Sequence, residues 1–215
     1  MITRPVLPAA LVETGIVAIV RAPTERFIVA AVETLVLAGV RCVELTLTMT
    51  NALDSIESLA SRCGEEASIG AGTVLTREQA RRCVDAGATF LVSPSTVQEV
   101  VTYAVETGTA CLPGALTPSE IVASWEAGAS AVKLFPASLG GVQYLRDVRA
   151  PLPDIPLIPT GGVLLDEVPE YLRAGALAVG MGSPLFRDAL AGGDLGELAA
   201  RAALALRSVR DGRAT

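Results

Sequence analysis

Short β-rich runs alternate with amphipathic helical stretches along the whole chain, and this alternation limits the possible folds more than any other feature. Eight runs have the composition of strands, and their ends recur every ~20–27 residues, the length of one strand–helix unit. Several runs are apolar almost throughout, which is typical of strands buried on both faces. The predicted strands span residues 16–21, 42–47, 68–72, 90–93, 110–113, 131–135, 157–160 and 177–181.

The stretches between these strands space their apolar residues as amphipathic helices do. Thr76 and Gln79 have the spacing of a helix-capping box, and Pro118 follows Thr117 where another helix is expected to begin. The predicted helices span residues 24–38, 51–61, 76–86, 95–106, 117–126 and 166–174. We also expect a short helix within residues 1–15, a final helix at 194–210 and a frayed end at 210–215.

Eight strands joined by helices in 215 residues predict one α/β domain over residues 1–215. The expected architecture is a closed (βα)8 TIM barrel with an N-terminal helix, and an open doubly wound sheet is the alternative. In such a barrel the active site lies at the carboxyl ends of the strands. Chemistry is therefore expected at those ends.

The residue counts exclude several classes of site and partner. The chain has no histidine, which excludes Ser-His-Asp and Cys-His nucleophile pairs and zinc sites with histidine ligands. Its net charge of −6, from 17 basic and 23 acidic residues, is spread along the chain and argues against nucleic-acid binding. No apolar stretch is long enough for a membrane span, and no signal peptide is apparent. The four cysteines form no Cys-x-x-Cys pair, which favours core packing in a reducing, cytoplasmic setting.

Lys133 is the single lysine of the chain, and it stands inside the apolar run from Ala131 to Phe135. A buried ammonium group is costly unless it is paired or loses its proton. The neutral amine of a lysine attacks carbonyl groups and forms Schiff bases. Lys133 is therefore the candidate nucleophile, and the alternative is a buried Lys–Glu ion pair with a structural role.

Glu44 lies in a strand whose polar and apolar residues alternate. Glu44, Thr46 and Thr48 share one face, and Val43 and Leu45 share the other. The polar face is expected to line the barrel interior, where a carboxylate could move protons near a Schiff base. The alternative is a salt bridge from Glu44 to a nearby cation.

Glycines follow the seventh and eighth strands, at Thr160-Gly161-Gly162 and Gly182-Ser183. Loops seven and eight of such barrels commonly bind phosphate through backbone N–H groups, and glycine lets the ligand approach closely. These loops therefore predict a phosphate site, unless the glycines serve only tight turns.

Two further strand ends carry groups that suit a carboxylate. Thr73 follows strand three with a hydroxyl, and Arg21 ends strand one with a guanidinium. Arg21 could instead pair with Glu44.

In combination these motifs resemble the class I 2-keto-3-deoxy-6-phosphogluconate (KDPG) aldolases, also called KHG/KDPG aldolases, over residues 15–186. The family acts on short 2-keto-3-deoxy and 4-hydroxy-2-oxo acids. The motifs that carry the resemblance are Glu44-Leu-Thr-Leu-Thr48, Gly70-Ala-Gly-Thr-Val-Leu75, Ser93-Pro94, Pro113-Gly114, Lys133-Leu-Phe-Pro136, Pro159-Thr-Gly-Gly-Val163 and Gly182-Ser183.

The resemblance implies a homotrimeric lyase that performs a retro-aldol cleavage giving pyruvate, without a metal or cofactor. Its partner would be a small phosphorylated 2-keto acid. Lys133 matches the Schiff-base lysine of the family, Glu44 its general acid/base and Thr73 the residue that holds the pyruvyl carboxylate. The other matched positions are Thr160, Gly161, Gly162 and Ser183, which contact the distal phosphate and hydroxyl groups, and Pro94 and Phe135, which shape the pocket.

One position departs from the family pattern. Many members have an arginine where this chain has Thr48, and that arginine binds the substrate carboxylate. Other members have an arginine at the end of strand one, as Arg21 is here, so Arg21 is expected to replace it. The substrate stays open among KDPG, its galactonate epimer KDPGal and 4-hydroxy-2-oxoglutarate (KHG). A phosphate-binding isomerase without covalent catalysis and an inactive barrel are the competing interpretations of the same residues.

Overall fold

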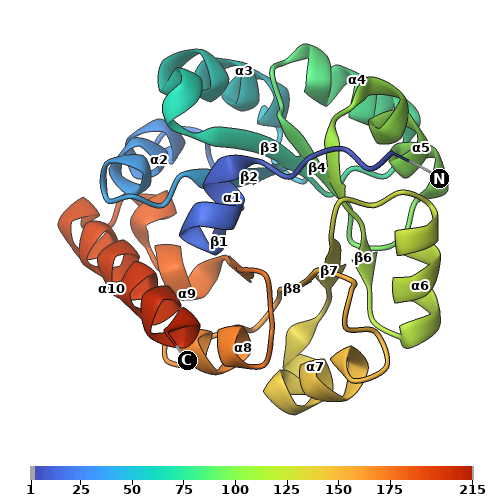
Figure 1. The fold of residues 1–215 in the computed structure, drawn as a ribbon. Coiled ribbons are helices and arrows are strands. Elements are labelled where there is room, and N and C mark those ends of the chain that lie inside the picture. The colour runs from blue at the N-terminus through green and yellow to red at the C-terminus, as the bar shows by residue number, and fades with distance from the viewer. Residues whose placement is uncertain (1–2, 215) are drawn as a thin grey trace.

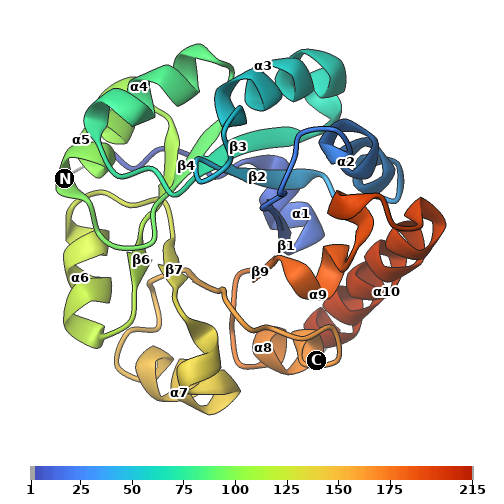
Figure 2. The same ribbon diagram turned by 180° about the vertical axis from the view of Figure 1, so that it is seen from behind.

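A curled parallel sheet of six strands forms the larger part of the framework (Figures 1 and 2). The computed structural model describes residues 3–214. The sheet has the order β5-β4-β3-β2-β1-β9. Its strands are β1 (Ile16–Val20), β2 (Cys42–Thr46), β3 (Ser68–Gly72), β4 (Phe90–Val92), β5 (Ala110–Leu112) and β9 (Val179–Met181).

Three further parallel strands form a second sheet in the order β6-β7-β8. They are β6 (Gly114–Ala115), β7 (Val132–Leu134) and β8 (Leu157–Pro159). In place of the single strand predicted at 110–113, the structure has two short strands, β5 and β6, which are separated by Pro113. Proline has no N–H to give to a ladder, which explains an interruption at this residue.

Backbone contacts connect the two sheets at both edges. Around Pro113, the Ser130 N–H donates to Cys111 O at 2.9 Å and the Lys133 N–H donates to Pro113 O at 2.9 Å. At the other edge, Thr160 and Gly180 form an isolated parallel bridge. The strands therefore follow one another in sequence order, except that β9 returns beside β1.

Helices surround the strands on the outside, except that α1 lies within the ring of strands in Figure 1. They are α1 (Ala9–Thr14), α2 (Ile28–Leu37), α3 (Ala52–Cys63), α4 (Arg77–Asp85), α5 (Gln98–Thr107), α6 (Pro118–Glu126), α7 (Gly141–Arg149), α8 (Val168–Arg173), α9 (Ser183–Phe186) and α10 (Leu195–Arg213). Short 3-10 turns lie at Gly64–Glu66, Ala137–Leu139 and Ala189–Ala191. None of the helices within residues 3–214 is both long and apolar enough to cross a membrane.

Side-chain caps begin two of the predicted helices, although at α4 the Gln79 side chain accepts the Leu75 N–H and not the Thr76 N–H that a full capping box needs. The Thr76 hydroxyl accepts the Gln79 N–H at 3.1 Å at the start of α4. Thr117 and Glu120 form a complete capping box at α6. Each cap satisfies backbone N–H groups that the first turn of a helix leaves without partners.

The helix boundaries differ from the prediction at several places, and three of them bear on the fold. Helix α2 begins at Ile28, not at residue 24. Helix α7 lies in a stretch where no helix range was predicted. Helix α10 continues to Arg213, so the expected fraying from residue 210 is wrong for residues 210–213, and Thr215 lies outside the described residues. The Arg213 guanidinium explains the ordered end, since it donates to the carbonyls of Glu13 at 2.9 Å and Val12 at 2.8 Å.

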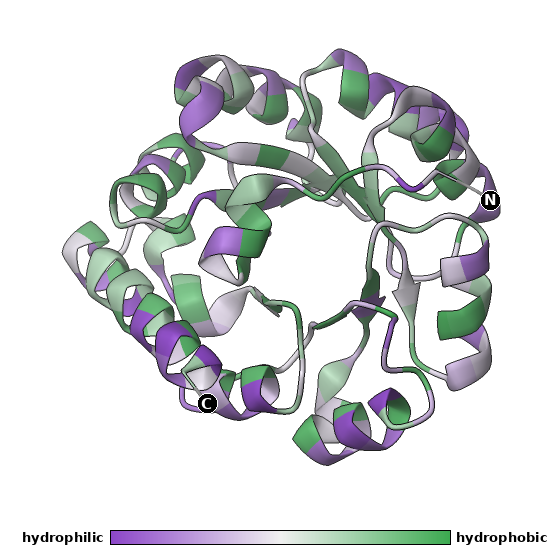
Figure 3. Cartoon of the chain, viewed as in Figure 1, coloured by the Kyte–Doolittle hydropathy of each residue, from purple (hydrophilic) through white to green (hydrophobic). Residues whose placement is uncertain are grey.

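The buried apolar side chains form two clusters, one between strands and helices and one among the strands themselves. The inner cluster contains alternate strand residues and Leu11 of α1. Its other members lie in the strands or directly before them: Val17, Cys42, Phe90, Val92, Ala110, Leu112, Ala131, Ile158 and Ala178. Side chains alternate along a strand, so Glu44 and Lys133 face the same interior as Cys42 and Ala131, two residues earlier. Figure 3 shows the complementary pattern, with hydrophilic residues concentrated on the outer faces of the helices.

Candidate active site

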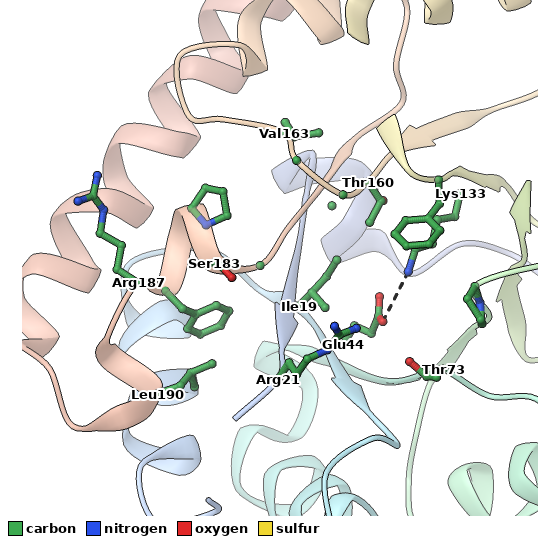
Figure 4. A pocket seen from close by; sticks show the side chains of 18 of the residues that line it. Ile19, Arg21, Glu44, Thr73, Lys133, Thr160, Val163, Ser183, Arg187 and Leu190 are labelled. Carbon is green, nitrogen blue, oxygen red and sulfur yellow. Dashed lines mark ion pairs between the residues drawn. The ribbon is translucent and has the colours of Figure 1, made fainter. Parts of the chain in front are cut away.

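A pocket of about 470 Å³ lies at the carboxyl ends of the strands (Figure 4). Its walls come from strands and loops that are far apart in sequence. Ten of the predicted site residues line it, and Thr48 does not. The ten are Arg21, Glu44, Thr73, Pro94, Lys133, Phe135, Thr160, Gly161, Gly162 and Ser183.

Lys133 and Glu44 face each other across the pocket floor. Lys133 Nζ lies 3.8 Å from Glu44 Oε1, and it lies 5.3 Å from the centroid of the Phe135 ring. Both side chains are nearly buried, with residue exposures of 9% for Lys133 and 2% for Glu44. The predicted ion pair therefore exists, and its position at the wall of a pocket leaves both groups within reach of a ligand.

The Glu44 carboxyl has a pKa above its usual range. Burial is the largest cause, because it penalises the ionised form, and the positive charges of Lys133 and Arg21 oppose it in part. A carboxyl group with a raised pKa keeps its proton to a higher pH than an exposed glutamate does. Glu44 therefore combines a raised pKa with a position beside the only lysine of the chain.

The proximal end of the pocket carries Thr73 and Arg21. The Thr73 side chain lies near Lys133 in Figure 4, at the residue that follows β3. Thr73 has a positive φ of 61°, which is unusual for a β-branched residue. Arg21 follows β1 and is exposed, with its side chain on the pocket wall. The two residues provide a hydroxyl and a guanidinium for an anionic group beside the amine.

Thr48 is exposed and does not line the pocket with Glu44. Strand β2 ends at Thr46, so the predicted alternation stops before Thr48 and the chain turns. The Thr48 hydroxyl lies 2.9 Å from Thr46 Oγ1, which in turn donates to Val20 O at 3.1 Å. These contacts give Thr48 a place in the turn outside the pocket.

The distal end of the pocket carries Thr160, the glycine pair and Ser183. Gly161 and Gly162 have φ values of 86° and 87°, a backbone conformation that glycine adopts without strain. A Cβ on Gly162 would lie 2.6 Å from the Ser138 Cβ, so a larger residue would also collide there. This backbone lets a ligand approach the chain closely.

The sequence analysis did not identify several residues of the pocket wall. Ile19, Phe186 and Leu190 add an apolar surface, and Arg187 adds a second guanidinium. Ile19 could have been found, because it lies near the carboxyl end of β1, two residues before Arg21. Residues 186–190 follow no motif that indicates their position.

The cysteines lie away from this chemistry. Cys42, Cys63, Cys83 and Cys111 are all buried and free of disulfides, as the core-packing interpretation predicts. Residues 3–214 also contain no group of three His, Cys, Asp or Glu side chains placed to hold a metal ion.

Comparison with known proteins gives consistent matches. The family model for KDPG and KHG aldolase matches residues 8–200. The 2-dehydro-3-deoxy-6-phosphogalactonate aldolase of Escherichia coli (strain K12) is 35% identical over 197 residues, covering 91% of this chain and 95% of the relative. The 2-dehydro-3-deoxy-phosphogluconate aldolase of Treponema pallidum (strain Nichols) is 35% identical over 168 residues, covering 77% and 80%. The structure of a Legionella pneumophila KDPG aldolase, with pyruvate captured at low pH as a covalent carbinolamine intermediate, has a TM-score of 0.84 at 26% identity. That match covers 94% of this chain and 97% of the other.

Proposed function

Because the chain belongs to the KDPG and KHG aldolase family and is therefore a lyase, we propose that it cleaves a 2-keto-3-deoxy-6-phospho sugar acid. The products are pyruvate and glyceraldehyde 3-phosphate. One observation carries the proposal: Lys133 Nζ lies 3.8 Å from Glu44 Oε1 inside a pocket that continues to Gly162 and Ser183. An amine, a proton-transfer group and a distal anion site are the parts that a Schiff-base aldolase needs.

The reaction begins at the keto group. The neutral Lys133 amine attacks C2 and forms a carbinolamine, and Glu44 supplies the proton with which the C2 hydroxyl leaves as water. The product is a protonated imine between Lys133 and C2. Thr73 and Arg21 hold the carboxylate next to C2, so that the amine meets the carbonyl in a fixed orientation.

The carbon–carbon bond then breaks. Glu44, as a carboxylate, takes the proton of the C4 hydroxyl, directly or through one water, and the C4–O bond becomes a carbonyl. The electron pair of the C3–C4 bond moves to C3 and on to the iminium nitrogen, which gives an enamine. The aldehyde leaves, C3 gains a proton from Glu44, and hydrolysis of the imine releases pyruvate and the free amine.

The first two candidate substrates, KDPG and KDPGal, differ only in their configuration at C4. KDPG and KDPGal are epimers there and give the same products. The match to the galactonate enzyme of E. coli extends over 91% of this chain, against 77% for the gluconate enzyme of T. pallidum, which supports KDPGal as the alternative to KDPG. KHG lacks a phosphate for the glycine pair and Ser183, which makes it the third candidate.

Borohydride trapping tests the proposal directly. The protein is incubated with pyruvate and borohydride, and the intact mass and the modified peptide are determined. Because Lys133 is the single lysine, only this residue and the N-terminal amine could form an imine. We expect one reduced adduct on Lys133, and none in a folded Lys133→Met variant. An unmodified wild-type protein would favour the phosphate-binding isomerase or the inactive barrel.

Cleavage assays separate the three candidate substrates. Pyruvate release from KDPG, KDPGal and KHG is measured with EDTA present, since the proposed steps use only the amine and the carboxyl. The acid with the highest kcat/KM identifies the substrate. If Lys133 forms the pyruvate adduct but none of the three acids is cleaved to pyruvate, all three candidate substrates are contradicted.

The assembly is proposed on the same resemblance. We propose that residues 1–215 form one domain, a closed eight-stranded barrel, and that three copies associate as a homotrimer in the cytoplasm. The backbone bonds across Pro113 and the Thr160–Gly180 bridge support closure. Sedimentation equilibrium tests the trimer, and a monomeric mass would contradict it.

A further inference from the structure

Arg187 lies at the distal end of the pocket, on the turn that follows α9. Ser183 stands between Lys133 and Arg187 in Figure 4, so Arg187 is the cation farther from the amine. Its side chain is exposed at the rim, and in Figure 4 the guanidinium points away from Lys133 and Glu44. Exposed side chains change rotamer within nanoseconds, so the guanidinium can turn toward a group bound beside Ser183.

The backbone of Arg187 has an unusual conformation. Its φ is 48°, and the described residues 3–214 contain only one other non-glycine residue with a positive φ, Thr73. Both residues line the same pocket. A backbone conformation that costs free energy persists where the surrounding structure imposes it, and such positions cluster at ligand sites. Glycine would adopt this backbone conformation without strain, so the presence of arginine indicates that its side chain has a function at this position.

A second arginine holds this turn in place. Arg201 of α10 donates from Nε to Leu185 O at 2.8 Å and from its terminal nitrogen to Phe186 O at 3.1 Å. These are the carbonyls that the end of α9 would leave without partners. The Arg201 side chain is only 12% exposed, and the Arg187 N–H bonds to Ser183 O at 2.8 Å. The turn from Ser183 to Arg187 is thus fixed on α10.

The two arginines differ in their charge partners. Arg201 pairs with Glu197 at 3.3 Å. Arg187 takes part in none of the ion pairs found among residues 3–214. A guanidinium without a carboxylate partner, on a residue that lines the pocket, is available for bidentate bonds to a phosphate once the side chain turns inward.

We propose that Arg187 is a specificity-determining residue that binds the distal phosphate of the substrate, and that Arg201 is the positioning residue that holds the Arg187 turn. The inference rests on the proposed function and deepens it, because it selects phosphorylated 2-keto-3-deoxy acids over their unphosphorylated forms. Arg201 does not touch the substrate. It acts through the backbone of residues 185–187.

The test compares Arg187→Gln with Arg187→Lys and with the control Arg207→Gln, whose arginine is exposed on α10 and does not line the active-site pocket. Each variant is assayed with the C4 epimer that the wild type cleaves faster and with its unphosphorylated form.

We expect Arg187→Gln to raise KM for the phosphorylated acid roughly tenfold, because a charge-assisted bond is lost, and to leave KM for the unphosphorylated acid unchanged. Arg187→Lys should recover part of the loss, because lysine keeps the charge without the bidentate geometry. Unchanged selectivity, or equal losses on both acids, would overturn the role of Arg187.

Binding of inorganic phosphate, measured by calorimetry, tests Arg187 without turnover. Roughly tenfold weaker binding in Arg187→Gln than in wild type supports the proposal, and equal affinity contradicts it. Borohydride trapping with pyruvate separates the two hypotheses: absence of a wild-type adduct rejects the aldolase, whereas an adduct with unchanged phosphate affinity in Arg187→Gln rejects only the role of Arg187.

Arg201→Gln tests the positioning role in a protein that keeps Arg187. Circular dichroism first establishes that the variant is folded, and Arg201→Lys replaces it if it is not. The expected result is a raised KM for the phosphorylated acid with kcat and the rate of pyruvate trapping unchanged. An equal loss of kcat/KM with both acids would mean that Arg201 only stabilises the fold, and it would overturn the proposal that Arg201 positions Arg187.

Discussion

Gly72 leaves the space that the Glu44 carboxylate occupies. A Cβ built on Gly72 would overlap the Glu44 side chain at its carboxyl end. In the β2–β3 ladder, Glu44 stands opposite Gly70 and Thr46 opposite Gly72, so the carboxylate leans along the neighbouring strand over a residue without a side chain. The orientation of Glu44 toward Lys133 therefore depends on a glycine in another strand.

Gly72→Ala should displace the Glu44 carboxylate and lower both kcat and stability. Overpacking a buried site costs about 1–3 kcal/mol, and misplacement of a proton-transfer group lowers kcat by roughly 100-fold. Urea unfolding and steady-state kinetics measure the two effects. Gly108→Ala is the control, because its φ of 69° strains an alanine and no atom lies within 4 Å of its added Cβ. The control should lose stability alone, and wild-type kcat in Gly72→Ala would refute the dependence.

Glu44→Gln should retain the shape of the pocket and lose proton transfer. We expect kcat to fall by roughly 100- to 10,000-fold, the usual contribution of general acid–base catalysis. Pyruvate trapping on Lys133 should slow as well, because Glu44 serves the dehydration step. A variant that traps pyruvate at the wild-type rate would restrict Glu44 to the cleavage step, and one with wild-type kcat would remove it from the mechanism.

Glu44 should also make the stability of the protein depend on pH. Burial raises the pKa of its carboxyl in the folded state, so the folded protein holds this proton more tightly than the unfolded chain. As pH rises from the unfolded pKa through the folded one, the unfolded chain binds fewer protons than the native state, and the free energy of unfolding falls. Glu44→Gln should lack this part of the fall, which begins near the unfolded glutamate pKa of about 4.3 and ends above the raised pKa of the folded state.

Urea unfolding of both proteins across that range measures the difference. The comparison is repeated in a Lys133→Met background, which removes the cation that opposes the shift. The fall should then be larger. Parallel curves for wild type and Glu44→Gln would mean that Glu44 has the same pKa in both states.

Arg21→Gln should weaken binding of the keto-acid carboxylate. A lost charge-assisted bond raises KM about tenfold, whereas Thr48→Val should change KM by less than about twofold because Thr48 does not line the pocket. Thr48→Arg adds the arginine that many family members carry at this position. In the Arg21→Gln background it should restore part of the affinity and shift the preference among the acids. Equal effects of Arg21→Gln and Thr48→Val would contradict the assignment.

All four thiols should resist a thiol reagent in the native protein. Burial raises the pKa of Cys83 to about 11 and that of Cys111 to about 12, and it also raises the pKa of Cys42 and Cys63. Only thiolates react quickly, and buried sulfur atoms are hard to reach. Reaction with a chromogenic disulfide, followed with and without urea, measures the contrast. Fast reaction of one thiol in folded protein would identify an exposed or activated cysteine.

The strand ends and most of the site were predictable because two simple rules govern them. Alternation along β2 put Glu44 on the interior face, and burial of a lone lysine in an apolar run marked Lys133. Thr48 does not line the pocket with Glu44, because alternation holds only inside a strand and the sequence does not show that β2 ends at Thr46.

The remaining differences come from tertiary contacts. The turn at Arg187 depends on bonds from Arg201, and the ordered end of α10 depends on bonds from Arg213 to α1. Arg201 is 16 residues from the carbonyl of Leu185 that it binds, and Arg213 is 200 residues from the carbonyl of Glu13. Local patterns carry no record of such partners, so neither feature could be inferred from composition or periodicity.

The bonds of Arg213 link α10 to α1, about 200 residues earlier in the sequence. Its guanidinium meets the carbonyls of Val12 and Glu13, and it also reaches Leu177 O at 3.3 Å before β9. A chain emerging from the ribosome has α1 long before α10, so this contact cannot form until α10 has been made. A protein without Arg213 would leave α1 and α10 to associate through their apolar side chains alone.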